Sequence, residues 1–366
     1  MKEKVIVITG ILGMDGSNMA EYLLKNEPDF KIVGVHRRSA NANFKNIKAF
    51  DNNPKFSLDY LDLADSVSIE TVIRKYSPMY FLNFGANSFV GCSWDMPLQV
   101  IDVNALGVLR CLEAIKQHCP TCRFYSAGSS EEFGNVDYSP QDIKHPIKPR
   151  SPYGVSKATA RHIVKVYRES YGLYAVHGIL FNHEGSRRGI EFVTKKITNG
   201  AARIVQSIKN NQKFEPIQLG NVDAKRDWSD SRDFVDGIWR MINQEKYRKP
   251  NCGIFFPKDY VLASGRTNSV RKFVEVAFEK LNFFQNLRWQ GTGLTEQFTG
   301  DFINNTGEPW RVPLVIINEK FYRPNEVELL LGDSTPAREE LQWSPQISFD
   351  KLVEDMVKSD LDEISK

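Results

Sequence analysis

Residues 5–16 read Val5-Ile6-Val7-Ile8-Thr9-Gly10-Ile11-Leu12-Gly13-Met14-Asp15-Gly16. A short, apolar, β-branched run is followed by a glycine-rich turn and then by an amphipathic segment with helical periodicity. In that context Gly10, Gly13 and Gly16 fit a tight turn, a close approach of the backbone to a pyrophosphate, and close packing of a helix on a strand. Amides at the N-terminus of the helix would face the phosphates. The stretch therefore predicts a dinucleotide site, and a plain structural turn is the alternative.

The rest of the first half continues this alternation of strands and helices. Apolar runs predict strands at Val5–Ile8, Ile32–Val35, Phe56–Leu61, Tyr80–Phe84, Arg123–Ser126 and Tyr174–Phe181. Helical periodicity predicts helices at Ser17–Lys25, Val67–Lys75 and Leu98–Gln117. Continuous apolar strands separated by helices are typical of a parallel sheet that is covered on both faces. We therefore predict an α/β fold with a doubly wound, Rossmann-type parallel sheet, which binds ligands beyond the carboxyl ends of its strands.

The second half has a looser pattern. After about Glu184, loops rich in Gly, Asn and Pro alternate with single helices such as Val270–Leu281. We expect residues 1–183 to form the dinucleotide-binding domain with the catalytic residues. Residues 184–366 would form a smaller, mixed part that mainly binds the substrate, with some segments returning to the first domain. No obvious linker separates the two parts, so we expect them to be in close contact.

Composition argues against several other classes of protein. The 366 residues carry 48 basic and 45 acidic side chains, and a net charge of +3 gives no basis for a nucleic-acid or membrane surface. The sequence contains no run of about 18 apolar residues, so no membrane span is predicted. Five cysteines without a signal peptide predict reduced thiols in a cytoplasmic protein. Cys119 and Cys122 form a CxxC pair, which we interpret as structural rather than as a redox or metal site because no second pair accompanies it.

The end of the second strand indicates which dinucleotide binds. An NAD site usually places Asp or Glu there to bond the ribose hydroxyls. Here the strand ends in Val35-His36-Arg37-Arg38-Ser39, with no acid. Two guanidinium groups and a hydroxyl suit a 2′-phosphate, so the sequence favours NADP over the alternative of a solvated basic loop.

Tyr153 and Lys157 are candidate catalytic residues. Ser151-Pro152-Tyr153-Gly154-Val155-Ser156-Lys157 opens a long predicted helix, and the four-residue spacing places Tyr153 and Lys157 on one face. A free tyrosine has a pKa of about 10, which is too high for a base at neutral pH. A nearby ammonium, together with a positive nicotinamide, would lower that pKa and let the phenolate take a hydroxyl proton.

A carboxylate follows the fifth strand. The chain reads Ala127-Gly128-Ser129-Ser130-Glu131-Glu132-Phe133-Gly134 after that strand. A simple reductase of this architecture needs only a hydroxyl here, whereas a Glu could abstract a proton α to a carbonyl and start a β-elimination of water. The alternative is a capping or solvent-facing pair of glutamates.

Together these residues resemble the extended short-chain dehydrogenase/reductase family and, more narrowly, its GDP-mannose 4,6-dehydratases. The family's TGxxGxxG turn matches Gly10, Gly13 and Gly16, and its Thr-Ser-Glu catalytic segment is similar to Ser129-Ser130-Glu131. The resemblance runs nearly end to end, through the stretches Tyr167–Gly172, Leu180–Glu184, Arg187–Gly189, Phe192–Thr198, Leu219–Asn221, Lys225–Trp228, Tyr322–Pro324 and Glu326–Val327.

The resemblance implies a lyase that converts GDP-mannose into GDP-4-keto-6-deoxymannose and water by an internal hydride cycle on bound NADP. This is the first step toward GDP-6-deoxyhexoses such as GDP-fucose or GDP-rhamnose. Tyr153 would deprotonate the sugar 4-hydroxyl, and Glu131 would remove the C5 proton. Ser129 would hydrogen-bond the substrate near O4, while Lys157 would also hold the nicotinamide ribose.

The resemblance also implies two sets of binding residues and no metal. The cofactor set is Gly10, Gly13, Asp15, Gly16, Arg37, Arg38, Asp62, Tyr153, Lys157, His183 and Arg188. The substrate set is Ser88, Asn182, Val193, Lys196, Arg226, Arg323 and Glu326. Asp62 would contact the adenine, and the family's basic loop reaches a neighbouring subunit, so a homotetramer or homodimer is expected.

The chain departs from the family pattern at several positions. Ser129 stands where the family has Thr, which keeps the hydroxyl. Glu132 stands where the family usually has an apolar residue, and Phe133 where it has Tyr. Strand alternation predicts that Glu132 points away from the pocket. Phe89 replaces a His near the sugar.

Three other functions compete with this interpretation. A sister dehydratase could act on CDP- or dTDP-glucose, but the dTDP enzymes resemble an Asp-Glu pair where this chain has Ser130-Glu131. A 4-reductase of the same fold would need no elimination base, and Glu131 argues against it. A non-enzymatic NADP-binding regulator would be expected to lose Tyr153 or Lys157, and both are present.

Overall fold

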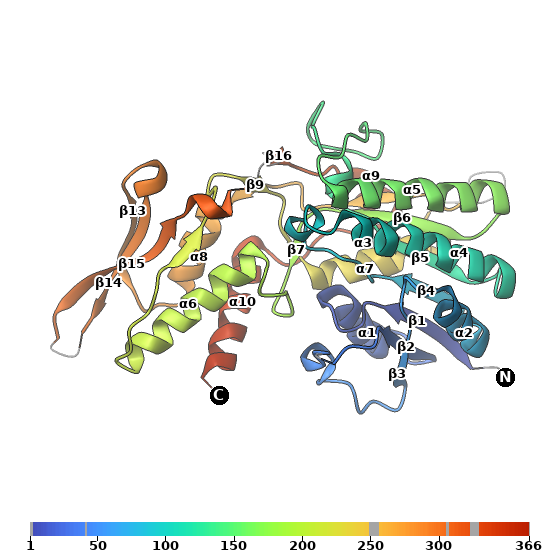
Figure 1. Ribbon diagram of the computed structural model, residues 1–366, viewed down its shortest axis with the longest axis horizontal. Helices are drawn as coiled ribbons and strands as arrows, with labels where there is room; N and C mark the ends of the chain where they lie inside the picture. The colour runs from blue at the N-terminus through green and yellow to red at the C-terminus, as the bar shows by residue number, and fades with distance from the viewer. Residues whose placement is uncertain (1–2, 41, 249–255, 305–306, 323–328, 366) are drawn as a thin grey trace.

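The computed structural model describes residues 3–40, 42–248, 256–304, 307–322 and 329–365. Two lobes lie side by side in it, with the parallel sheet in the right-hand lobe of Figure 1 and a smaller lobe of helices and antiparallel strands on the left. In this view the N-terminus is at the right-hand edge of the sheet lobe and the C-terminus is at the lower edge of the smaller lobe. Within the described ranges, no helix is both long and apolar enough to cross a membrane.

Seven strands of the described chain form one parallel sheet, in the order β11-β6-β5-β4-β1-β2-β3. They are β1 (Lys4–Thr9), β2 (Phe30–His36), β3 (Phe56–Tyr60), β4 (Tyr80–Asn83), β5 (Arg123–Ala127), β6 (Ala175–Leu180) and β11 (Tyr260–Leu262). The strand order reverses between β1 and β4, which is where a doubly wound sheet binds its ligand. The predicted fold class is therefore confirmed, with six strands near their predicted positions and a seventh, β11, that the sequence pattern did not reveal.

Helices cover both faces of the sheet. On one face lie α1 (Met14–Asn26) and α7 (Ser231–Ile242), and on the other lie α2 (Ser66–Tyr76), α4 (Gly107–His118) and α5 (Pro152–Tyr171). Alternation along β1 supplies both cores, because Ile6 and Ile8 pack under α1 and α7 whereas Val5 and Val7 pack under α2, α4 and α5. Burial of side chains on both faces is what makes these strands read as continuous apolar runs.

The predicted helix at Leu98–Gln117 is interrupted. It forms α3 (Pro97–Ile101), a π-helical turn η3 (Asp102–Leu106), and then α4. The π turn buries Asn104, whose side chain bonds the loop after β4, with Asn87 N donating to Asn104 Oδ1 over 2.8 Å. π turns inside α-helices are often found at functional sites.

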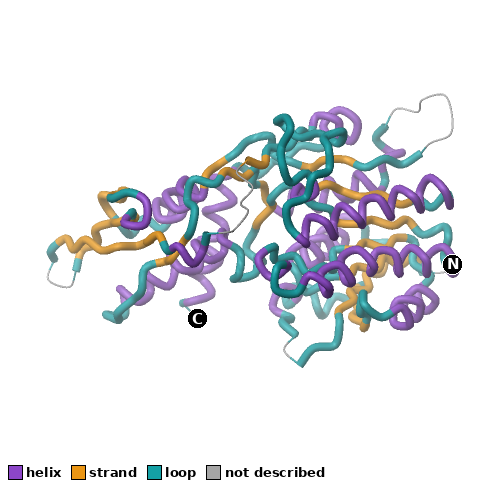
Figure 2. The backbone as a smooth tube through the Cα atoms, turned by 45° about the horizontal axis from the view of Figure 1, so that its top comes forward, coloured by secondary structure: helices purple, strands orange, loops and turns teal. Residues whose placement is uncertain are grey.

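The smaller lobe has its own core. Helices α6 (Val193–Lys209), α8 (Val270–Lys280) and α10 (Phe349–Ile364) pack against strands β8 (Ile217–Leu219), β14 (Gln297–Ile303) and β15 (Pro309–Ile317). The strand β13 (Gln285–Gln290) is at the outer edge of that sheet, and the hairpin of β14 and β15 extends away from the body of the molecule in Figure 2.

Short pairs of strands connect the two lobes. β7 (His183–Glu184) pairs with β10 (Ser229–Asp230), and β9 (Lys225–Arg226) lies between β12 (Asn268–Ser269) and β16 (Leu329–Leu330). Beyond residue 183 the chain returns to the sheet lobe through α7, β11 and α9 (Thr335–Leu341). The lobes are thus joined by several crossings of the chain.

Candidate active site

The glycine turn is closed by backbone contacts. Gly10 has φ +65°, a conformation that favours glycine, and its carbonyl accepts from Gly13 N over 2.9 Å. A Cβ on Gly16 would lie 2.4 Å from Gly10 O, and one on Gly10 would lie 2.9 Å from Gly85 N. Gly13 caps α1 without a side-chain hydrogen bond, so the helix presents its first amides to a ligand. This cradle fits a pyrophosphate.

The adjoining ends of β1 and β4 are fixed by one hydroxyl. Thr9 Oγ1 donates to Asn83 Oδ1 over 2.6 Å and accepts from Gly85 N over 2.9 Å. Because the sheet reverses its order between these strands, the hydrogen bonds hold the floor of the crevice in which a dinucleotide would lie.

Basic side chains follow β2, as the sequence predicted. Arg37 and Arg38 are both exposed, and the guanidinium carbon of Arg38 lies 4.9 Å from the centre of the Tyr60 ring at the end of β3. Asp62 is half-buried just beyond, where its Oδ1 accepts from Ala64 N over 2.9 Å. β2 and β3 are neighbours, so these charges gather at one corner of the sheet edge. The arrangement suits an adenosine with a 2′-phosphate.

Asp15 is engaged by protein groups. Its carboxylate bonds His183 Nε2 over 2.9 Å and accepts from Ser231 Oγ over 2.8 Å. Burial would raise the pKa of Asp15, but His183, Ser231 and Arg188 outweigh it and lower that pKa. Asp15 therefore ties the glycine turn to β7 and to the start of α7.

Tyr153 and Lys157 share one face of α5, as predicted. Helix α5 begins at Pro152 with Ser151 as its cap, whose side chain accepts from Gly154 N. A Cβ on Gly154 would lie only 2.6 Å from Glu131 O. The absence of that atom lets α5 pack directly on the turn after β5. The glycine therefore brings the tyrosine and the carboxylate segment together.

The pKa of Tyr153 differs in direction from the sequence-based prediction. Burial raises the pKa of Tyr153 well above its usual value, and the hydrogen bond with Ser129 and the charge of Arg188 only partly oppose that rise. Burial also lowers the pKa of Lys157 to about 8, while Glu132 and Asp15 oppose the fall. Lys157 Nζ donates to Ala127 O over 2.7 Å and lies 5.8 Å from the centre of the Tyr153 ring. The predicted lowering of the tyrosine pKa is therefore not achieved by the protein's own groups.

Ser129 and Glu131 lie in a short 3-10 helix, η4 (Ser130–Glu132), directly after β5. Ser129 Oγ accepts from Glu131 N over 3.2 Å and hydrogen-bonds Tyr153. Glu131 is half-buried, and its charge acts on Tyr153. The structure thus brings together the four predicted catalytic residues, Ser129, Glu131, Tyr153 and Lys157.

Glu132 lies on the inner side of this turn and is fully buried. Strand alternation does not explain its direction, because residues 130–132 form a 3-10 turn rather than a strand. Its Oε1 accepts from Ser129 N and contacts His177 Nε2, each over 2.9 Å. Sequence reasoning missed this partnership, and it also missed Asn104, which donates to Ser156 Oγ on α5 over 3.0 Å.

The predicted substrate residues come from both lobes. Asn182 follows β6, and its side-chain oxygen is buried without a hydrogen-bond partner among the described residues, so it is free to accept from a ligand. Lys196 is in the first turn of α6, where burial lowers its pKa and its Nζ lies 3.4 Å from the centre of the Phe321 ring. Val193 begins the same helix, and Arg226 is buried in β9. Ser88 is exposed in the loop after β4. Arg323 and Glu326 lie outside the described residues.

Phe89 joins the two sides of the crevice. Its ring packs edge-on against Phe192 with 5.9 Å between centres, and the guanidinium carbon of Arg188 lies 3.4 Å from the centre of the Phe192 ring. Arg188 also forms an ion pair with Glu184, with Nε 2.9 Å from Oε2. Phe89, which replaces the family's histidine, therefore makes an apolar contact next to Arg188. The charge of Arg188 favours a lower pKa for both Asp15 and Tyr153.

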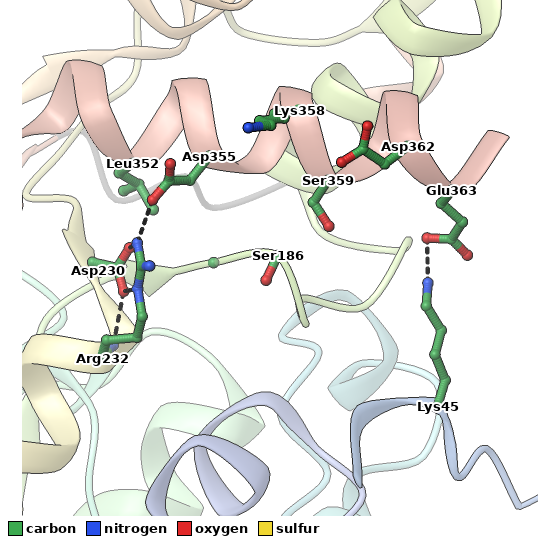
Figure 3. Close-up of a pocket in the computed structure, with 11 residues that line it drawn as sticks. Lys45, Ser186, Asp230, Arg232, Leu352, Asp355, Lys358, Ser359, Asp362 and Glu363 are labelled. Carbon is green, nitrogen blue, oxygen red and sulfur yellow. Dashed lines mark hydrogen bonds and ion pairs between the residues drawn. The ribbon is translucent and has the colours of Figure 1, made fainter. Parts of the chain in front are cut away.

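A cavity of about 510 Å³ lies elsewhere, between α10 and the sheet lobe. Its lining contains none of the predicted site residues. Opposite charges across it pair with one another, with Lys45 bonded to Glu363, and Arg232 bonded to Asp355 over 2.6 Å (Figure 3). We interpret it as an ion-paired junction between the lobes rather than as the reaction site.

The doubly wound sheet, the glycine turn and the Tyr153–Lys157 pair on α5 define an extended short-chain dehydrogenase/reductase. The family model described as GDP-mannose 4,6 dehydratase matches residues 7–356. The chain belongs to the GDP-mannose 4,6-dehydratase family.

Individual relatives give the same result. The GDP-mannose 4,6 dehydratase of Drosophila melanogaster is 40% identical over 377 residues, which cover 100% of this chain and 88% of that protein. The human protein of that name is 39% identical, covering 98% of this chain and 91% of its own length. Among solved structures, a dTDP-glucose 4,6-dehydratase from Bacillus anthracis in complex with NAD has a TM-score of 0.75 at 18% identity, covering 97% of this chain and 96% of its own. At that identity the last comparison concerns the fold.

Proposed function

We propose that this protein converts GDP-mannose into GDP-4-keto-6-deoxymannose and water. The observation that carries this proposal is the convergence of Glu131 with Ser129, Tyr153 and Lys157 in a chain that is about 40% identical to GDP-mannose 4,6-dehydratases over its whole length. A 4-reductase needs the tyrosine and the lysine, but it has no use for a carboxylate held next to them.

NADP is the proposed cofactor. The turn of Gly10, Gly13 and Gly16 would hold its pyrophosphate, Arg37 and Arg38 its 2′-phosphate, and Asp62 its adenine. Lys157 would hold the nicotinamide ribose, while Asp15, His183 and Arg188 would shape the pocket through their mutual contacts. When bound, NADP supplies a hydride acceptor and, once reduced, a hydride donor, so the cofactor is regenerated within each turnover.

The protein's own groups would manage the protons. Tyr153 would take the proton of the sugar 4-hydroxyl, and Ser129 would hydrogen-bond O4 from the same side. A 4-keto group makes the C5 proton acidic, and Glu131 would remove it. The C6 hydroxyl then leaves as water with the proton that Glu131 took from C5. C5 takes up one proton at the end of the cycle, which balances the proton that Tyr153 removed from the 4-hydroxyl. Because burial keeps the pKa of Tyr153 high, a positive charge next to the phenol is needed before it can act as a base near neutral pH.

Residues of the smaller lobe would hold the nucleotide portion of the substrate. Lys196 and Arg226 supply cations opposite a diphosphate, and Asn182 supplies an unsatisfied amide oxygen. Ser88, Val193, Arg323 and Glu326 complete the proposed set. In this assignment residues 1–183 mainly bind the cofactor, and residues 184–366 mainly bind GDP-mannose.

A homo-oligomer, either a dimer or a tetramer, is also proposed. Leu98 of α3, Leu106 of η3, and Val155 and Val166 of α5 are exposed apolar side chains on helices that pack against one another. Several such residues on neighbouring helices suit an interface between copies. Light scattering on the purified protein, with Leu98→Lys as the variant that should favour monomer, tests this. A wild-type monomer would contradict it.

The proposed compartment is the cytoplasm. In the described part of the chain Cys92, Cys111, Cys119 and Cys122 form no disulfide, and burial raises the pKa of Cys111 and Cys122, which suits structural cysteines in a reducing compartment. Cell fractionation would test the assignment, and recovery of the protein outside the cytoplasmic fraction would contradict it.

The central experiment incubates the protein, loaded with NADP, with GDP-mannose and no added reductant. Mass spectrometry should detect a nucleotide sugar that is lighter by one water, and Glu131→Gln should abolish it. Unchanged GDP-mannose would reject the proposed activity. Normal turnover by Glu131→Gln would reject the assignment of the base. Parallel incubations with CDP- and dTDP-glucose test the sister dehydratases.

A further inference from the structure

An acid–imidazole pair lies directly behind the catalytic turn. Glu132 of η4 and His177 of β6 are both fully buried, with 2.9 Å between Oε1 and Nε2. β5 and β6 are neighbouring strands, and His177 is opposite Ser126, three residues before Ser129. The pair therefore lies under the end of the strand that carries the proposed base.

One oxygen of this pair fixes the backbone of the turn. Glu132 Oε1 accepts from Ser129 N over 2.9 Å, while Ser129 Oγ accepts from Glu131 N over 3.2 Å. The backbone at Gly128 is packed closely against the pair, because a Cβ there would lie 2.2 Å from His177 Nε2 and 2.7 Å from Glu132 Oε1. The turn therefore has no room to move toward His177. Displacement of Glu132 would thus move Ser129 and, through it, Glu131.

The bond from Ser129 N to Glu132 closes a capping box at the start of η4, whereas the contact with His177 has no such local role. Glu132 Oε2 and His177 Nδ1 are buried without hydrogen-bond partners among the described atoms. Each unsatisfied buried polar atom costs about 1–3 kcal/mol, and apolar residues of similar volume would avoid that cost. A role in the site is a better explanation than stability.

The charge of Glu132 reaches the reacting groups. The charged groups that act on Lys157 are Glu132 and Asp15, and those that act on Tyr153 are Glu131 and Glu132 against Arg188. Glu132 raises the pKa of both residues, and it does so from the protein side, where it does not touch the substrate.

We propose that Glu132 and His177 form a positioning pair for the elimination: their hydrogen bonds hold Ser129 and Glu131 in line with Tyr153, and the Glu132 carboxyl group lies behind the Tyr153–Lys157 pair. The proposal rests on the proposed function and adds to it two residues that do not touch the substrate.

Three variants separate geometry from charge. Glu132→Gln keeps an oxygen for Ser129 N but removes the charge, Glu132→Leu removes both, and His177→Gln removes the imidazole. Gln244→Leu is the matched control. Gln244 is also fully buried and bonds backbone groups, with Lys258 N and O each at 3.0 Å. It follows α7 and contacts the segment before β11, away from the carboxyl edge of the sheet.

The measurements are kcat and KM for GDP-mannose from pH 6 to 10, together with melting temperature. Loss of the charge in Glu132→Gln should move the pH dependence of kcat to lower pH by on the order of one unit, with kcat at its optimum largely kept. Glu132→Leu should lower kcat by about 10- to 100-fold with little change in KM, because the base is misplaced. His177→Gln should fall between them. Gln244→Leu should melt earlier with unchanged kcat and pH profile.

A readout without turnover completes the test. In protein carrying ¹³C-labelled lysine, the NMR titration of Lys157 should move to lower pH in Glu132→Gln and stay in place in Gln244→Leu. Kinetic parameters and a lysine titration that match wild type in the Glu132 variants would overturn the proposal, even if their stability fell. If the wild type released no product, the proposed function would fail, and the lysine titration would still decide whether Glu132 acts on this site.

Discussion

Gly154→Ala tests whether the distance between α5 and the catalytic turn controls the reaction. The added Cβ would lie 2.6 Å from Glu131 O and 3.0 Å from the Pro149 Cβ, whereas an ordinary Cβ contact is 3.4 Å or longer. Backbone atoms cannot rotate away as a side chain can. The helix and the turn must therefore separate by about 0.8 Å, the difference between 3.4 and 2.6 Å.

That displacement falls on the reacting groups themselves, since Gly154 directly follows Tyr153 and the obstructing oxygen belongs to Glu131. A misplacement of about 1 Å typically costs on the order of 100-fold in rate. We expect kcat to fall by about that factor, with KM for GDP-mannose changed much less. Overpacking should cost about 1–3 kcal/mol of stability, partly offset by the roughly 0.5–1 kcal/mol that Ala gains over Gly in a helix.

The assay is steady-state formation of the dehydrated sugar, quantified by mass spectrometry, alongside thermal melting. Gly237→Ala in α7 is the matched control, because its Cβ would lie 2.8 Å from Trp343 Nε1, in a core remote from Tyr153. It should lose stability and keep kcat. A Gly154→Ala protein with kcat within twofold of wild type would refute the argument that this glycine sets the distance.

Three further predictions concern charge, cofactor and sugar. Lys157 has a folded pKa of about 8, below its usual 10.5, so the folded state binds fewer protons than the unfolded state between those values. Its burial therefore weakens the cofactor-free protein below about pH 8, and the deficit disappears as pH rises toward 10.5. Lys157→Met should be inactive, but its free energy of unfolding near neutral pH should be higher by about 2 kcal/mol, after allowing for the lost bond to Ala127 O. A gain in stability that grew as pH rose would contradict the predicted direction of this pH dependence. In fluorescence titrations, Arg38→Glu should weaken NADP binding by roughly 10- to 100-fold and NAD binding much less. The control is Lys55→Glu, at the amino end of β3, which should change the affinity for neither dinucleotide. Phe89→His should lose about 1 kcal/mol of stability with its aromatic contact and should lower KM for GDP-mannose, and an unchanged KM would show that position 89 does not face the sugar.

The strands of the sheet were predictable because burial on both faces leaves a strong, local apolar signal. All six strands predicted in the first half occur in the structure. The strand β11 escaped detection because three residues, Tyr260–Leu262, carry no period, and its place beside β6 depends on packing with distant segments. The break in the helix after Leu98 depends likewise on Asn104, whose partners Asn87 and Ser156 come from other elements.

The same distinction applies to the candidate site. Spacing was enough to pair Tyr153 with Lys157, because one helix carries both. Their pKa values depend on burial and on groups such as Arg188 and Glu132 that are far away in sequence or on a different element, so no local pattern reports them. The direction of Glu132 depended on a 3-10 turn that strand alternation does not describe.

The late position of β11 has a consequence for how the protein is made. Tyr260 follows the end of β6 by 80 residues, and Trp343, which packs into the same core, comes later still. At roughly 5–20 residues per second, a ribosome needs about 4 to 16 s between β6 and β11. During that interval the nascent chain carries a sheet with an open edge at β6 and an uncovered apolar face. We therefore expect the sheet lobe to complete its folding only after Trp343 has been synthesised, and we expect chaperones to be needed most before that point.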